Sequence, residues 1–69
     1  MPESVYKIVE VVGSSPESWE KAAAAAVQRA SSSLRDLRIA EVVEQDIQIE
    51  GGKIHAYRAK LKLSFKMED

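Results

Sequence analysis

Apolar and polar side chains alternate along the last part of the chain, residues 54–67. One series is almost entirely apolar: Tyr57, Ala59, Leu61, Leu63, Phe65 and Met67. The other series is cationic or polar: Arg58, Lys60, Lys62, Ser64 and Lys66. A period of two residues is typical of a β-strand with one buried and one solvated face. We therefore predict an amphipathic strand here.

Residues 37–49 also read as a strand, but neither of its faces is cleanly apolar. Strict alternation places one series on the first face: Ile39, Glu41, Val43, Gln45 and Ile47. The second face receives the other series: Ala40, Val42, Glu44, Asp46 and Gln48. Each face carries at least one acid, so the pattern alone does not say which face is buried.

The N-terminal half predicts a strand followed by a helix. Residues 4–12 are rich in β-branched and aromatic side chains, and Gly13 is expected to end this strand. Ser15 is placed to cap a helix that reaches about Ser33, with Pro16 in its first position and Glu17 beside its positive end. The stripe that this helix would bury is narrow and mostly small: Trp19, Ala22, Ala23, Ala26, Val27, Ala30 and Leu34. Such a stripe indicates a helix packed very close to a sheet.

A two-residue turn, Gly51-Gly52, is expected to join the last two strands as a hairpin. If Glu50 opposes Lys53, the pairs on the helix side are Val42–Leu61 and Ala40–Leu63. The pairs on the reverse side are then Glu41–Lys62, Val43–Lys60, Gln45–Arg58 and Ile39–Ser64. This register exposes three apolar side chains on the reverse side: Ile39, Val43 and Ile47. Exposed apolar patches mark interfaces, so another subunit is expected there.

These elements predict an α+β fold of order β-α-β-β, in which a three-stranded antiparallel sheet wraps on one helix. The 69 residues are expected to form a single domain, residues 1–69. A domain of this size is marginally stable alone, and the lack of cysteine excludes both disulfides and thiolate zinc sites. Oligomerisation is the expected remedy.

Charge and hydropathy exclude two classes of partner. The formal net charge of −1 argues against a nucleic-acid partner, which calls for a basic surface. No apolar run reaches the roughly 18 residues that a membrane span requires, so no membrane partner is expected. We predict a cytoplasmic protein.

Candidate chemistry is sparse, and the chain is not expected to be an enzyme. There is no thiol, and the single histidine, His55, is expected to be solvated or hydrogen-bonded. Glu44 and Asp46 are more informative. The expected register places them on the helix side, opposite Ala59 and Tyr57, with no cation directly across. Carboxylates of this kind suit Ca²⁺ or Mg²⁺, while a solvated role and an inter-subunit ion pair stay open as alternatives.

Three segments together resemble the dodecin family over residues 4–67: VYKIVEVVGSSPESWEKAAAAAV, LRIAEVVEQ and AYRAKLKLSFKMED. The resemblance rests on their order: a strand, a Gly-Ser-Ser turn, a helix, an Ala-Glu-Val strand, a hairpin and a last strand. It implies a hollow homo-dodecamer of tetrahedral symmetry that binds flavins without catalysis. In some members it also implies metal ions in the channels.

The same resemblance assigns candidate site residues. Ile39 stands where flavin-binding members carry a tryptophan that stacks on the isoalloxazine ring. Arg58 stands where they use a glutamine, and Gln48 replaces an acid. These differences predict weak binding of riboflavin and FMN, as in the calcium-dodecin branch. Glu17 and Glu44 match acids near channel ions in the family, and Asp46 is added from its spacing.

Three functions stay open at this point. The first is a dodecin-like cage that stores or buffers ions or small ligands. The second is a genuine flavin-binding and storage dodecin. The third is a small enzyme subunit that acts on an anionic substrate through the basic face around Arg58.

Overall fold

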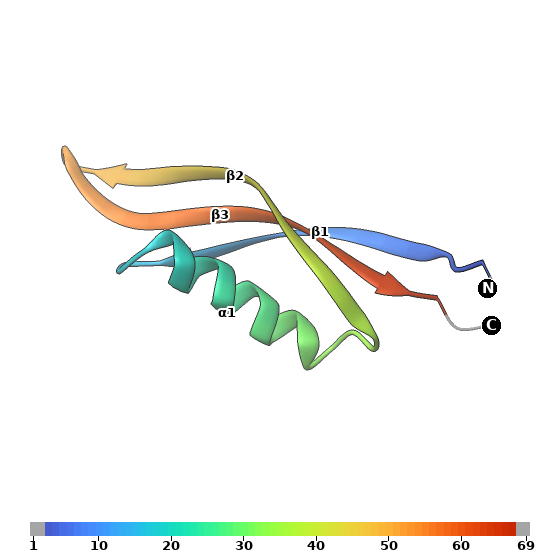
Figure 1. The fold of residues 1–69 in the computed structure, drawn as a ribbon. Coiled ribbons are helices and arrows are strands. Elements are labelled where there is room, and N and C mark those ends of the chain that lie inside the picture. The colour runs from blue at the N-terminus through green and yellow to red at the C-terminus, as the bar shows by residue number, and fades with distance from the viewer. Residues whose placement is uncertain (1–2, 68–69) are drawn as a thin grey trace.

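The computed structural model describes residues 3–67, and the ends of the predicted domain, residues 1–2 and 68–69, lie outside this range. Within it the chain forms β1 (Tyr6–Ser15), α1 (Trp19–Ser31), β2 (Leu37–Glu50) and β3 (Lys53–Lys66). The strands make one antiparallel sheet in the order β1-β3-β2, and α1 covers one of its faces (Figure 1). The predicted β-α-β-β fold is therefore confirmed. No helix within residues 3–67 is long and apolar enough to cross a membrane.

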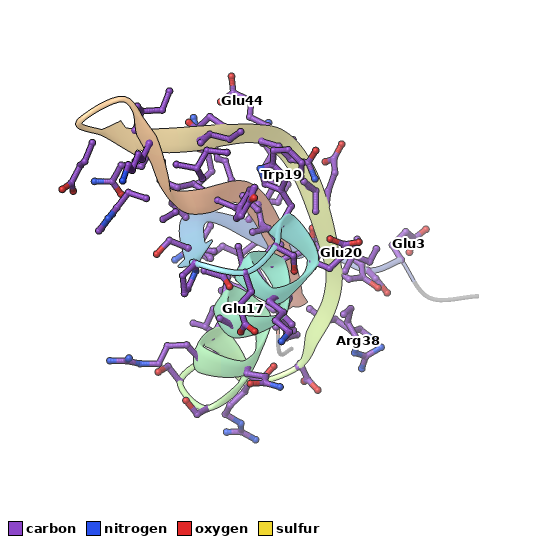
Figure 2. All side chains as sticks on the ribbon, turned by 90° about the vertical axis from the view of Figure 1, so that its left-hand side faces the viewer. Glu3, Glu17, Trp19, Glu20, Arg38 and Glu44 are labelled. Carbon is purple, nitrogen blue, oxygen red and sulfur yellow. The ribbon has the colours of Figure 1, made fainter. Side chains whose placement is uncertain are left out.

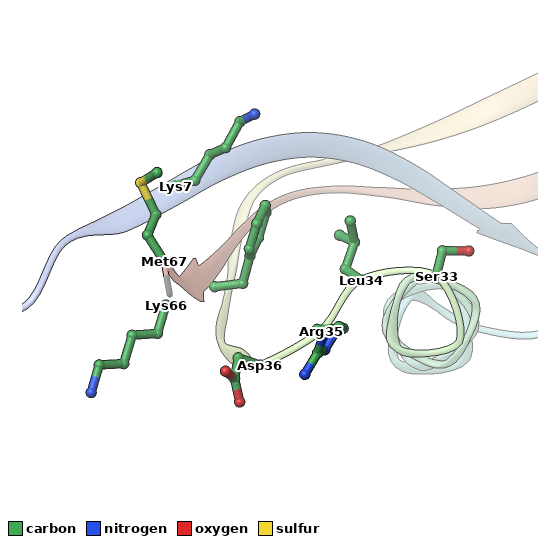
Figure 3. Close-up of a pocket in the computed structure, with 8 residues that line it drawn as sticks. Lys7, Ser33, Leu34, Arg35, Asp36, Lys66 and Met67 are labelled. Carbon is green, nitrogen blue, oxygen red and sulfur yellow. The ribbon is translucent and has the colours of Figure 1, made fainter. Parts of the chain in front are cut away.

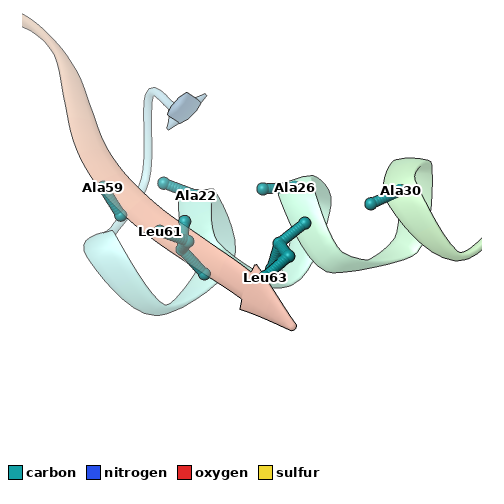
Figure 4. Packing of buried hydrophobic residues seen from close by; sticks show 6 residues of the cluster. All are labelled: Ala22, Ala26, Ala30, Ala59, Leu61 and Leu63. Carbon is teal, nitrogen blue, oxygen red and sulfur yellow. The ribbon is translucent and has the colours of Figure 1, made fainter. Parts of the chain in front are cut away.

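The core lies between α1 and the middle of β3. It consists of the predicted alanine stripe of the helix and the apolar series of β3 (Figure 4): Ala22, Ala26, Ala30, Ala59, Leu61 and Leu63. Among the described residues, Leu61 and Leu63 are the large side chains that are fully buried. A core of two leucines and several alanines removes little apolar surface from water, so one chain alone is weakly stabilised.

β1 runs through Gly13, which corrects the prediction that this glycine ends the strand. Gly13 pairs with Ala59 of β3 and is buried under α1. A Cβ at this position would clash with the carbonyl oxygen of Ala22 and would lie 3.0 Å from the Cβ of Ala26. The glycine therefore lets the helix approach the sheet, because it brings no side chain between them.

The helix begins three residues later than predicted. Ser18 is its N-cap, and the Ser18 hydroxyl accepts a hydrogen bond of 3.1 Å from the Lys21 amide. Ser15, the expected cap, is buried and accepts a hydrogen bond of 3.0 Å from the Glu17 amide instead. Ser15 thus shapes the turn between β1 and α1, while the cap itself follows the usual serine preference.

The β2–β3 hairpin extends beyond the start of α1 (Figure 1). Its turn is the predicted Gly51-Gly52 pair, with φ of 57° and 75°, a conformation that glycine adopts without a steric penalty. The pairing of Glu50 with Lys53 is confirmed at the turn. At the far end of the hairpin the predicted pairs are confirmed as well: Val42–Leu61, Ala40–Leu63, Glu41–Lys62 and Ile39–Ser64.

Between these two ends the register of the hairpin is displaced by one residue. The pairing shifts between Val42 and Glu44, which leaves Val43 as the extra residue of β2. It shifts back between Gln48 and Ile49, where His55 is the extra residue of β3. The predicted pairs Val43–Lys60 and Gln45–Arg58 are wrong for this reason. A β-bulge moves every following side chain to the other face until a second bulge restores the register.

Candidate functional site

The displaced register collects acids on one face of β2. Glu44 opposes Lys60 and Asp46 opposes Arg58, whereas the prediction placed these acids opposite Ala59 and Tyr57. Side chains directly across an antiparallel pair lie on the same face. Glu44 and Asp46 therefore lie on the face away from α1, which we call the outer face. Figure 2 shows Glu44 on the far side of the sheet from the helix.

The prediction that Ile47 lies on the reverse side is also wrong. Ile47 opposes Tyr57, whose ring contacts Trp19 of α1 edge to face with ring centroids 5.1 Å apart. Ile47 therefore lies on the helix side, although it remains 36% exposed. Val43 lies in the bulge and is partly buried, and Ile39 stays on the outer face opposite Ser64.

The acids of β2 face cations of β3 in a regular series on the outer face. We call this series the charged ladder, and its pairs are Glu41–Lys62, Glu44–Lys60 and Asp46–Arg58. On the other side of β3, Glu10 of β1 also opposes Lys62. The premise that no cation lies across from Glu44 and Asp46 is thus overturned. Acids therefore match most of the basic face that could have served an anionic substrate, whereas Lys66 at its end opposes Tyr6 of β1.

The best-formed pair of the charged ladder is Asp46–Arg58. The Nε and Nη2 groups of Arg58 donate hydrogen bonds of 2.7 and 2.8 Å to the two carboxylate oxygens of Asp46. This parallel geometry is the strongest arrangement that a guanidinium and a carboxylate can adopt. The hydrogen bonds from Arg58 lower the pKa of Asp46, and the same contacts raise the pKa of Arg58.

The other predicted metal ligands make looser contacts. Glu44 is 70% exposed, and its Oε1 lies 3.5 Å from Lys60 Nζ. Glu17 is 63% exposed, and its Oε2 accepts a hydrogen bond of 2.9 Å from Lys21 Nζ. Within residues 3–67 no three acidic or histidine side chains come together closely enough to hold a metal ion. His55, expected to be solvated or hydrogen-bonded, is exposed, with its Nε2 3.5 Å from Glu50 Oε2.

The residues predicted to match a flavin pocket, Ile39, Gln48 and Arg58, are spread along the outer face. Gln48 opposes Ala56, so it is the next outward position after Asp46 and lies near Arg58. Ile39 opposes Ser64, six residues from Arg58 along β3, which amounts to about 20 Å at about 3.3 Å per residue. That span is longer than a flavin ring system. A pocket that used both Ile39 and Arg58 would therefore have to be shared between two copies of the chain.

The surface of the described residues has hollows at the bulge and beyond the end of α1. One, of about 360 Å³, opens at the bulge and is lined by Val42, Val43, Glu44 and Gln45. The other, of about 380 Å³, lies beyond the end of α1 (Figure 3). Its lining combines apolar and charged side chains: Lys7, Ser33, Leu34, Arg35, Asp36, Phe65, Lys66 and Met67. Of the six predicted site residues, only Glu44 lines either hollow.

Alternation alone does not predict this arrangement of the site, but the positions of the acids in the sequence do indicate a bulge in β2. With one extra residue at Val43, the outward positions become Ile39, Glu41, Glu44, Asp46 and Gln48. The acids then fall on one face instead of two. A strand whose acids change face halfway along is the pattern that a single bulge produces.

Comparisons with known proteins agree with this fold. The dodecin family model matches residues 5–68. The calcium dodecin of Mycobacterium tuberculosis is 53% identical over 64 residues, which are 93% of this chain and 90% of that protein. Its crystal structure, described as that of a calcium-chelating antigen with a novel calcium-binding site, covers 94% of this chain and 93% of its own, with 56% identity and a TM-score of 0.83. The dodecin of Streptomyces coelicolor is 40% identical with a TM-score of 0.92, covering 100% of this chain and 99% of its own. The chain belongs to the dodecin family.

Proposed function

We propose that this chain forms a non-enzymatic homo-dodecamer that binds Ca²⁺ between its subunits for storage or buffering, with only weak flavin binding. One observation carries the proposal: the chain is 53% identical to a calcium dodecin, while a single copy holds no group of three metal ligands within residues 3–67. Ca²⁺ takes six to eight oxygen ligands, so its site would require carboxylates from more than one copy.

The need for assembly is supported by the apolar side chains that one chain leaves exposed. Several lie on the outer face, where Ile8 and Ile39 flank Ser64 from the two neighbouring strands and are 56% and 57% exposed. Others lie near the hairpin turn, where Ile49 pairs with Ile54 and the two are 64% and 56% exposed. Patches of this kind are covered by a partner in stable proteins, and closed symmetric homo-oligomers are the commonest solution.

Among the candidate calcium ligands, Glu44 and Glu17 are better placed than Asp46. Both are mostly exposed and each has a single lysine partner, which a divalent cation can displace. Asp46 has both carboxylate oxygens bound by Arg58 and would have to lose that pair first. Repetition of Glu17 or Glu44 around a symmetry axis would gather the several oxygens that the ion requires.

Weak flavin binding follows from Ile39. An aliphatic side chain offers contact area but no flat π-face, and the loss of an aromatic stacking partner costs about 1–3 kcal/mol per ring by analogy with nucleobases. Arg58 could stack on a ring, but its guanidinium is held by Asp46. The charged ladder in turn weakens the support for the alternative of an enzyme subunit, because acids oppose Arg58, Lys60 and Lys62 of the basic face.

The proposal is tested by thermal unfolding with Ca²⁺ and with a chelator. Ca²⁺ should raise the melting temperature of the wild type, because a ligand that binds the native state stabilises it by mass action. The gain should shrink in Glu17→Gln or Glu44→Gln. It should persist in the control Glu50→Gln, which removes an exposed acid beside the hairpin turn. Equal melting temperatures with Ca²⁺ and with chelator in the wild type would refute the proposal.

A further inference from the structure

Asp46 connects three elements of the fold. Its carboxylate binds Arg58 of β3, as described above, and its backbone carbonyl accepts a hydrogen bond of 3.0 Å from the indole Nε1 of Trp19 in α1. Trp19 lies between the helix and the sheet (Figure 2), with its ring against Tyr57. The main chain at Asp46 is thus fixed from the helix side while its side chain points to the outer face. The carboxylate is therefore presented to Arg58 in a fixed position.

The neighbouring pair of the charged ladder lacks this fixation. Glu44 and Lys60 make one contact of 3.5 Å, and Glu44 follows directly on the bulge. The two pairs therefore differ in how firmly they hold their cation, although both are cross-strand pairs of one acid and one base on the same face. Arg58 is the cation of this face that is most fully committed to a partner within its own chain.

We propose that Asp46 is a specificity-determining residue: by holding Arg58, it makes the outer face discriminate against ligands that carry a phosphate. This inference rests on the proposed function, because it takes Arg58 to be a residue of the ligand pocket. A free arginine binds phosphate through two parallel hydrogen bonds. An arginine already neutralised by a carboxylate offers a phosphate little net charge, and the carboxylate itself repels the anion.

Asp46 is charged throughout the neutral pH range, as an ordinary aspartate is, and the hydrogen bonds from Arg58 lower its pKa further. The groups around Asp46 on the outer face are Arg58 and Lys60 of β3, Glu44 and Gln48 along β2, and Ser14, which opposes Arg58 from β1. Lys60 is paired with Glu44, so Arg58 is the cation that Asp46 itself holds. Replacement of Asp46 by a neutral isostere would therefore release Arg58.

Riboflavin and FMN form a matched pair of probes, because they differ only in a phosphate. The ratio of their affinities should be measured by fluorescence quenching in the wild type, Asp46→Asn, Asp46→Glu and Glu41→Gln. Asp46→Asn keeps the backbone carbonyl for Trp19 and should raise the preference for FMN on the order of tenfold, the equivalent of about one charge-assisted hydrogen bond. Asp46→Glu retains the charge and should stay near the wild-type ratio.

Glu41→Gln changes the net charge by the same amount on the same face and serves as the matched control, because Lys62 opposite it still faces Glu10 of β1. The proposal is supported if the preference for FMN over riboflavin rises less than about threefold in this variant and rises by the full amount in Asp46→Asn. Equal gains in both would mean that net charge alone decides, and would overturn it. An unchanged affinity ratio in Asp46→Asn would also overturn the proposal. A failure of both FMN and riboflavin to bind any of the variants would overturn it too. The double variant Asp46→Asn/Arg58→Gln should return to the wild-type ratio if Arg58 is the released cation.

The calcium experiment separates this inference from the proposed function. Asp46→Asn should keep the Ca²⁺-dependent rise in melting temperature, since Asp46 is the candidate ligand least free to bind the ion. An intact Ca²⁺ effect with an unchanged FMN preference would overturn the role of Asp46 alone. If Ca²⁺ does not raise the melting temperature of the wild type, the proposed function itself is overturned instead. Trp19 fluorescence in Asp46→Asn should match the wild type, which confirms that the helix contact is retained.

Discussion

Gly13 of β1 lies directly against the backbone carbonyl of Ala22 in α1, with no room for a side chain between them. Gly13→Ala would place a methyl group against the Ala22 carbonyl oxygen and the Ala26 side chain, and neither can move without shifting the helix. Overpacking of this kind costs about 1–3 kcal/mol. Chemical denaturation should show a lower midpoint for Gly13→Ala with the slope unchanged.

Gly51→Asn is the control for that experiment. Gly51 has a φ of 57°, and no atom lies within 4 Å of the position a Cβ would take. Asparagine tolerates this backbone conformation and is favoured in two-residue hairpin turns. The control should therefore unfold near the wild-type midpoint. A Gly13→Ala variant as stable as the wild type would show that the helix can retreat from the sheet at little cost.

Acidification should weaken the fold through Asp46. Because the pKa of this carboxyl is lower in the folded chain, the Arg58 pair stabilises the protein above the ordinary aspartate pKa of about 4 and is lost as the pH falls through the folded value. The raised pKa of Arg58 has no effect in this range, because arginine stays charged in both states. The melting temperature of the wild type should fall more steeply below about pH 4 than that of Asp46→Asn.

Arg58→Gln provides the control for the acid experiment, since it removes the partner and leaves the carboxylate. As the pH falls below about 4, the melting temperature of Arg58→Gln should decrease as gradually as that of Asp46→Asn. If all three proteins lose stability in parallel as the pH falls, then the Asp46–Arg58 pair does not contribute, and the steep part of the curve belongs to other carboxylates.

Flavin affinity should respond to Ile39. Ile39→Trp together with Arg58→Gln supplies a flat stacking surface and a neutral amide at the two positions that the sequence predicts to contact flavin. The double variant should quench riboflavin fluorescence at concentrations where the wild type does not. Ile39→Leu, which changes shape without adding a ring, should gain nothing. Binding of riboflavin by the wild type below micromolar concentrations would contradict the assignment of Ile39.

The fold was largely predictable because its signals are local. The alternation of β3, the alanine stripe from Ala22 to Ala30 and the Gly51-Gly52 turn each predict an element by themselves, and the turn predicts the register next to it. The start of the helix was missed because Ser15 and Ser18 are both followed by acids within two residues. Sequence propensity alone does not decide between two such serines.

The charged ladder was not predicted, because it depends on two bulges that cancel each other. The register counted from the turn is correct at Glu50 and again at Val42, so nothing at either end reveals the displacement between them. Yet that displacement decides whether Asp46 faces Tyr57 or Arg58. The contact between Trp19 and the Asp46 carbonyl joins residues 27 positions apart in the sequence, and no local pattern indicates it.

The most direct test of this account is a calorimetric titration of the purified, assembled wild type with Ca²⁺ after removal of bound metal, beside Glu44→Gln. Light scattering should first give a mass far above the 7.6 kDa of one chain. The account predicts saturable Ca²⁺ binding to the wild type, and binding at least about tenfold weaker in the variant, which corresponds to about 1.4 kcal/mol. A folded monomer, or an assembly that takes up no Ca²⁺ at millimolar concentration, would contradict it.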